Sequence, residues 1–175
     1  MRKKILSVAL IAVLLMGFTA CGGGSTSIVD DVKRQVATMI KGNIKGETGK
    51  TYGTQWFEFT IDSIKAVDSY SGYSAEKGYR LIDVLVTEKC TFDQAIPMGT
   101  FDFYMDSKDF EDYIYPINPL DDTMMPEEFD LAPGETVSYH MVYEIPEHAP
   151  DLKLIYTEWD EEEKEGATFT IDVKL

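Results

Sequence analysis

Three side chains that could form a hydrolase site lie close together near the end of the chain. Ser138, His140 and Glu144 share one phase of an alternating stretch, and serine, histidine and a carboxylate are the groups of a catalytic triad. Residues two apart on a strand are separated by about 6.5 Å, too far for a direct Ser–His hydrogen bond. The chain also lacks the G-x-S-x-G motif of α/β-hydrolases. We therefore expect an exposed polar strand face here, and no enzyme activity.

Acidic side chains could instead bind a divalent cation. The stretch 106–112 offers oxygen ligands for calcium, but it lacks the alternating acids, central glycine and final glutamate of an EF-hand loop. The acidic run 160–163 is more typical of a solvated hairpin loop. We expect neither metal nor cofactor, and a solute- or divalent-cation-binding surface module that uses the acidic loops is the alternative function.

Aromatic side chains are the last candidates for a contact site. Trp56 falls in the polar phase of a strand-like stretch, and Tyr70 and Tyr73 crowd a loop that also contains Gly and Ser. Exposed aromatic rings on a rigid scaffold can stack on sugars or on the side chains of a partner. The simpler interpretation, which we favour, is that these rings close the end of the core. Trp56, Tyr70 and Tyr73 are therefore speculative partner contacts.

The amino-terminal 21 residues have the layout of a secretory signal peptide. Three cations at 2–4 precede the apolar stretch 5–18, and small residues lie just before Cys21. A cysteine directly after the cleavage point resembles the lipobox of bacterial lipoproteins, in which that cysteine carries the lipid. The 16 residues of 5–20 are fewer than the about 20 that a membrane span needs. We expect a lipoprotein signal peptide over 1–20 and a lipid on Cys21, which would anchor the protein to the outer face of the bacterial cytoplasmic membrane.

The other cysteine has no partner for a disulfide. Lipid attachment would consume the sulfur of Cys21, which leaves Cys90 alone. Cys90 follows an apolar stretch, so we expect a small, partly buried hydrophobic residue there. A secreted domain without a disulfide must depend on its apolar core.

The charge of the chain restricts its partners. The formal net charge is −15, and removal of residues 1–20 takes away three cations and no acids, which gives −18. Such an acidic surface excludes nucleic acid, because phosphate binding depends on clustered Lys and Arg. Cationic partners are compatible with it.

Two patterns divide the chain. Residues 22–27 form a Gly- and Ser-rich leash, and apolar residues at helical spacing predict a helix over 28–41. The polar, glycine-rich stretch 46–53 indicates a linker or loop. We therefore assign 21–50 to the lipidated cysteine, leash and helix, and 51–175 to one folded domain.

That domain has the pattern of an antiparallel β-sandwich. Residues 57–61 alternate between apolar and polar, and 80–88 is apolar on both faces, which indicates a central strand. The remaining alternating or short runs are 101–106, 113–115, 137–145, 152–156 and 169–175. Seven short strands separated by turn signals predict an all-β, antiparallel sandwich.

Four motifs give the domain a family resemblance: WFEFTI at 56–61, YRLIDVLVT at 79–87, LAPGETV at 131–137 and VYEIP at 142–146. The stretch 51–175 resembles the immunoglobulin-like domain catalogued as domain of unknown function 4352. Those domains are similar in fold to telokin, and many follow a lipobox in Gram-positive bacteria. The resemblance implies a fold and a place on the cell surface, and it brings no established activity.

Together these features predict a lipid-anchored extracytoplasmic domain that works by binding. The membrane is contacted through the lipid on Cys21, and the expected partner is a protein or peptide that is cationic or amphipathic.

Overall fold

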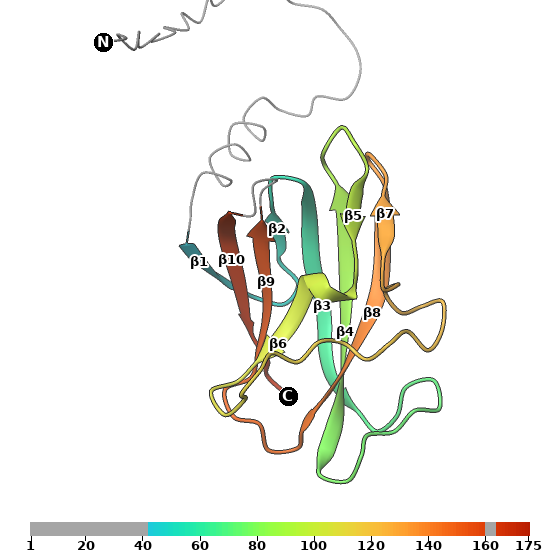
Figure 1. Ribbon diagram of the computed structural model, residues 1–175, viewed down its shortest axis with the longest axis vertical. Coiled ribbons are helices and arrows are strands. Elements are labelled where there is room, and N and C mark those ends of the chain that lie inside the picture. The colour runs from blue at the N-terminus through green and yellow to red at the C-terminus, as the bar shows by residue number, and fades with distance from the viewer. Residues whose placement is uncertain (1–41, 160–163) are drawn as a thin grey trace, which may run out of the picture.

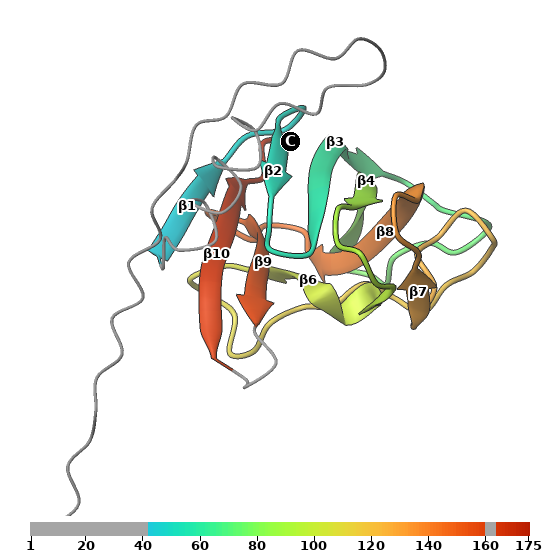
Figure 2. The same cartoon turned by 90° about the horizontal axis from the view of Figure 1, so that it is seen from above.

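The computed structural model describes residues 42–159 and 164–175, which form a sandwich of two four-stranded sheets (Figure 1). One sheet has the order β1-β10-β9-β6 and the other the order β2-β3-β4-β8, while β5 and β7 form a separate pair at one end. Figure 2 shows the two sheets side by side from above. The predicted all-β sandwich is confirmed.

The elements are β1 Gly42–Gly46, β2 Thr51–Gly53, β3 Phe57–Val67, β4 Tyr79–Cys90, β5 Ile96–Met98, η1 Thr100–Asp102, β6 Phe103–Asp106, β7 Phe129–Leu131, β8 Thr136–Pro146, β9 Lys153–Trp159 and β10 Glu165–Asp172.

Strand β4 lies in the middle of its sheet, between β3 and β8, as its two apolar faces predicted. Its even-numbered side chains face the space between the sheets, because alternate residues of a strand point to opposite faces. Ile82, Val84 and Val86 are fully buried in this core-facing row. The same row begins with Arg80 and contains Glu88 near its other end. One strand thus directs two chargeable groups toward the core.

The opposite face of β4 is also covered, but only at one end. Leu81, Met124 and Val142 form a small second apolar cluster there. The loop between β3 and β4 lies over it, with Tyr70 and Tyr73 packed against the cluster. Because this loop covers Leu81, its side chain is completely buried although it points away from the main core.

Aromatic rings dominate the main core. Phe59 contacts five other rings at centroid distances of 5.2–6.0 Å, and these come from both sheets: Tyr52, Phe57, Phe103, Tyr156 and Phe169. Edge-to-face and tilted pairs of this kind contribute about 0.5–1.5 kcal/mol each beyond their area burial. Cys90, 1% exposed, belongs to this core and behaves as a small hydrophobic residue.

The first sheet begins earlier than the sequence pattern indicated. Residues 42–46 form β1, which pairs in parallel with β10, and 51–53 form β2 within the stretch expected to be a linker or loop. β1 has a single apolar residue, Ile44, and therefore no alternating pattern. Its strand conformation depends on the edge of β10, which is a tertiary effect that overrides local preference.

Two of the expected strands are shorter than predicted. Residues 100–102 form the 3-10 helix η1, so that β6 begins at Phe103. The run 113–115 makes only an isolated bridge, between Ile114 and Met105. Pro116 and Pro119 follow it closely, and proline cannot donate to a strand ladder.

Several predictions concern other parts of the chain. The signal peptide 1–20, Cys21, the leash, the helix 28–41 and the acidic run 160–163 all lie outside the described residues. Within 42–159 and 164–175, no helix has the length and apolar character of a membrane span.

Candidate binding pockets at the two ends of the sandwich

The predicted contact residues lie at opposite ends of the sandwich. Trp56 directly precedes β3, whereas Tyr70 and Tyr73 follow it. An 11-residue strand is about 35 Å long. The structure therefore brings Tyr70 and Tyr73 together but separates both from Trp56, and the three cannot form one contact patch.

Tyr70 and Tyr73 are bound into the loop between β3 and β4. Their backbones exchange hydrogen bonds of 2.9 and 2.8 Å. The Tyr70 hydroxyl lies 2.8 Å from Thr123 Oγ1, and the Tyr73 hydroxyl donates to Glu144. That hydrogen bond is the main cause of the raised pKa of Tyr73. Because both rings also pack on the Leu81 cluster, their geometry is that of side chains that close the core.

Trp56 lines a cavity of about 350 Å³ at the other end, which we call the aromatic pocket. Its ring meets the ring of Phe92 edge-on at 4.7 Å between centroids. Tyr156 lies in the wall, and Trp159 is 56% exposed at the same cavity. A partly open pocket with aromatic walls can accept an apolar or cationic side chain.

Asp102 supplies the acidic group in the wall of this pocket. The 3-10 helix η1 positions it, and its Oδ2 accepts a hydrogen bond of 2.7 Å from the backbone N–H of Gly99. Burial raises the pKa of Asp102 to about 6, although the Gly99 hydrogen bond acts in the opposite direction. The buried Glu158 accepts a 2.6 Å hydrogen bond from the Gln55 backbone N–H nearby in the fold. At neutral pH the pocket therefore holds an ionised carboxylate beside aromatic rings.

A third acid, Glu88, lies in the core on the same side of the molecule. It is 0% exposed, and neither carboxyl oxygen has a hydrogen-bond partner among the described residues. Burial raises its pKa to about 8, and the charge of Asp102 adds to the shift. Burial also raises the pKa of Tyr156, to which Asp102, Glu158 and Glu88 contribute. Glu88 is therefore neutral at pH 7.

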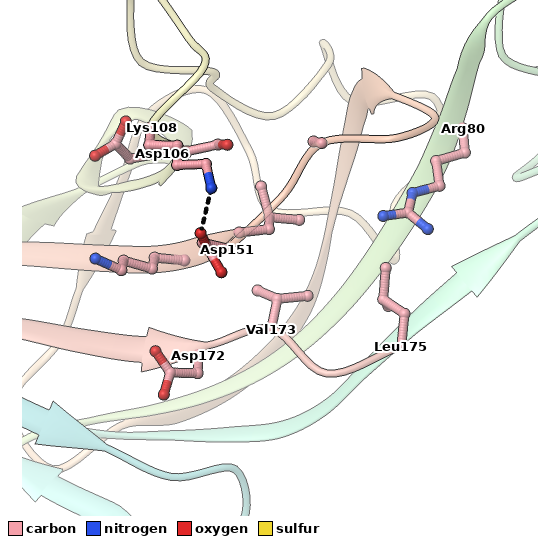
Figure 3. Close-up of a pocket in the computed structure, with 11 residues that line it drawn as sticks. Arg80, Asp106, Lys108, Asp151, Asp172, Val173 and Leu175 are labelled. Atoms are coloured by element: carbon pink, nitrogen blue, oxygen red, sulfur yellow. Dashed lines mark ion pairs between the residues drawn. The ribbon is translucent and has the colours of Figure 1, made fainter.

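A larger cavity, of about 680 Å³, lies at the opposite end, where β9 begins and β10 ends. Figure 3 shows Arg80 extending from β4 toward Val173 and Leu175, with Lys108 and Asp151 across the cavity. Lys108 forms a 2.9 Å ion pair with Asp151. We call this cavity the arginine pocket.

The hydrolase-like residues do not form a triad. Ser138 Oγ lies 2.7 Å from Thr87 Oγ1, whereas His140 Nδ1 lies 2.7 Å from Asp83 Oδ1. Glu144 instead accepts hydrogen bonds from the Tyr73 hydroxyl and the Glu76 backbone N–H, in the loop between β3 and β4. Within 42–159 and 164–175, no group of three or more His, Cys, Asp or Glu side chains is placed to hold a metal ion.

Sequence patterns missed most of the residues around both pockets. Phe92, Asp102 and Trp159 reach the aromatic pocket from three separate segments, so that no local spacing connects them. Arg80 and Glu88 did leave a signal, because both share the phase of Ile82, Val84 and Val86. A charged residue in a buried phase indicates a special environment.

Known structures share the sandwich. The protein ycdA of Bacillus subtilis, described as a proposed lipoprotein, has 18% identity and a TM-score of 0.54; the match covers 73% of this chain and 39% of ycdA. An uncharacterised β-sandwich protein of Clostridium difficile (CD630_09570) has 18% identity and a TM-score of 0.51, over 77% of this chain and 97% of its own. The secreted protein MPT63 of Mycobacterium tuberculosis has 10% identity and a TM-score of 0.56, over 75% and 98%.

These likenesses show the fold alone. The chain spans well under half the length of ycdA, so that the activity of that whole protein is not transferred by the match. No family model matches the chain, and no curated protein matches it either. The class that the structure defines is a β-sandwich, a fold also seen in the secreted and uncharacterised proteins above.

Proposed function

We propose that this protein is a lipid-anchored extracytoplasmic domain that binds a protein or peptide partner and catalyses no reaction. The support for anchoring is the leader 1–20 with Cys21 directly after it, together with the description of ycdA. The four motifs that resemble domain of unknown function 4352 lie on β3, β4 and β8 or directly beside these strands, and we propose that the domain is of that type.

The aromatic pocket is the observation that carries the binding function. It combines ring faces with the Asp102 carboxylate in a cavity of about 350 Å³. A cation over an aromatic face gains about 0.5–2 kcal/mol, more when the site is desolvated. The same cation can pair with Asp102, and the formal charge of −15 attracts it from a distance. The partner that fits best is a basic, amphipathic peptide segment that inserts a Lys or Arg side chain.

Tryptophan fluorescence provides a direct test. Trp56 and Trp159 both line the pocket, so that a bound peptide should change the emission of the protein. The probe is an acetylated, amidated peptide of alternating Lys and Leu, compared with its Glu–Leu counterpart. We expect saturable binding of the basic peptide only, weakened as salt rises, because ions screen attraction beyond about 8 Å at physiological strength.

Matched variants locate the contact. Trp56→Ala should speed dissociation of the basic peptide, with Trp159 still reporting, and Asp102→Asn should weaken binding. Tyr113→Ala removes a ring that is 54% exposed outside the pocket and should change nothing. Equal affinity in wild type and in both pocket variants would exclude this pocket as the contact.

Anchoring requires a separate test in cells. Cys21→Ala should release the protein into the medium or leave it unprocessed, because the sulfur that carries the lipid is gone. Mass spectrometry of the wild-type protein that finds an unmodified Cys21 at the amino terminus would disprove lipidation without affecting the peptide-binding result.

A further inference from the structure

The guanidinium of Arg80 has no partner in the part of the chain that the structure describes. No ion pair or side-chain hydrogen bond joins Arg80 to residues 42–159 or 164–175, and its Nε is buried without an acceptor. The chain has 31 acidic residues against 16 basic ones, so an arginine would readily find a carboxylate. The side chain is only partly exposed, which makes an uncompensated charge there unfavourable.

The position of Arg80 directs this charge into the arginine pocket. Arg80 belongs to the core-facing row of β4, and its side chain extends between the two sheets (Figure 3). Leu152, Val173 and Leu175 supply the apolar part of a wall that is otherwise mostly polar. A guanidinium beside an apolar wall binds a carboxylate more strongly than in water, because water competes less for its N–H groups.

Four of the five other charged side chains of the pocket are already paired or oppose a strongly negative ligand, and Lys153 is the exception. Asp151 pairs with Lys108, and Asp172 pairs with Lys45, each at 2.9 Å. With Asp106, the wall contains three acidic side chains and also three basic ones. A dianionic phosphate would be repelled by these carboxylates, whereas a single carboxylate matches the planar fork of one guanidinium.

We propose that the arginine pocket binds the carboxylate of a small aliphatic ligand, such as an amino acid or the carboxyl terminus of a peptide, with Arg80 as the recognition group. The apolar wall would receive the aliphatic part of that ligand, and the guanidinium would donate two hydrogen bonds to the carboxylate. This site is independent of the proposed peptide-binding function, since it lies at the other end of the sandwich and selects the opposite charge.

The probe is N-acetyl-leucine, observed by nitrogen–proton NMR of the full folded domain. We expect saturable shifts of the Arg80 side-chain N–H and of backbone amides at Asp151, Leu152 and Val173. N-acetyl-leucinamide, which lacks the charge, should bind at least about tenfold more weakly. Free leucine is the second arm, and tighter binding than N-acetyl-leucine would indicate an amino acid whose ammonium meets the carboxylates rather than a peptide terminus.

Variants separate recognition from a merely structural role. The aliphatic stem of an arginine can cover apolar surface while its head reaches water. Arg80→Met keeps that stem, so the fold should survive while affinity falls at least about tenfold. Arg80→Lys should be intermediate, because lysine lacks the fork. Lys89→Met removes an exposed cation from the same strand and should bind as wild type.

Two outcomes would overturn the proposal. One is the absence of any N-acetyl-leucine shift at these residues in the folded wild-type protein at millimolar ligand. The other is equal affinity in wild type and Arg80→Met, which would place the carboxylate elsewhere.

Discussion

Arg80 and Glu88 occupy the same core-facing row of β4, yet their environments differ in a way that follows from their chemistry. Glu88 is completely buried, whereas Arg80 is partly exposed at a large cavity. A carboxyl group can avoid the cost of a buried charge by keeping its proton, and the raised pKa of Glu88 shows this response. A guanidinium stays charged at any pH that a protein tolerates. It must therefore meet solvent or an anion.

The side chains around Glu88 and around Arg80 also differ. The Glu88 end gathers Asp102 and Glu158 near aromatic rings, while the Arg80 end combines ion pairs with an apolar wall. The two proposals therefore assign opposite preferences to the two ends, a cation to one and an anion to the other. The charged groups behind this contrast are Asp102, in η1, and Arg80, at the start of β4.

The strongest test of the comparison is Glu88→Gln, followed across pH. The folded pKa of about 8 exceeds the ordinary value of 4.5, so folded protein keeps a proton that unfolded protein loses between these values. Stability should fall by about 1.4 kcal/mol per pH unit in this window, about 5 kcal/mol in total. Glu88→Gln should lack this loss. Urea midpoints of both proteins at pH 5, 6.5 and 8 measure it, and parallel pH profiles would show that Glu88 does not titrate as a buried acid.

Asp102→Asn should produce a smaller effect at lower pH. The pKa of Asp102 is raised from 3.8 to about 6, so its destabilising ionisation falls between these two values. The linkage amounts to roughly 3 kcal/mol at most, reduced by loss of the charge-assisted hydrogen bond to Gly99 N–H. Thermal midpoints of wild type and variant should converge below pH 4 and diverge up to pH 6. A divergence that begins only above pH 7 would contradict this assignment.

Tyr73→Phe tests the loop between β3 and β4, which lies at the Arg80 end of the sandwich. The substitution removes the hydrogen bond to Glu144 but keeps the ring over the Leu81 cluster. We expect a small loss of unfolding free energy and unchanged binding of the Lys–Leu peptide. Chemical denaturation and peptide titration of the same sample measure both quantities. Weaker peptide binding would mean that the loop contributes to the contact, as one interpretation of the sequence allows.

The smallest expected stability effect is that of Arg80→Met. Because the guanidinium has no described partner and its stem is retained, the change in unfolding free energy should stay within about 0.5 kcal/mol. It should also leave the decline between pH 5 and 8 intact, in contrast to Glu88→Gln. A loss of several kcal/mol would show that Arg80 holds the fold through contacts that its geometry does not suggest.

Some parts of the molecule could be predicted from the sequence, and others could not. The central position of β4 followed from two apolar faces, and the sandwich followed from repeated alternation. Strand β1 could not be found in this way, since its only apolar residue is Ile44 and its pairing with β10 joins distant parts of the chain. Of the residues that line the aromatic pocket, the sequence singled out only Trp56, as a speculative partner contact. Asp102 and Trp159 approach it through long-range packing that no local pattern encodes.

If the protein is held by its amino terminus, as proposed, the parallel pairing of β1 with β10 has a mechanical consequence. Gly42 pairs with Ala167, close to Trp159, so that a tether would pull at the end of the sandwich that carries the aromatic pocket. A pull from a ligand at the far end would slide β1 along β10 and load all five register pairs together. A pull from a partner near Trp56 would act at the same end as the tether, so that the force would not be transmitted along the length of either sheet. The domain would therefore resist force better when the load is applied at the Arg80 end.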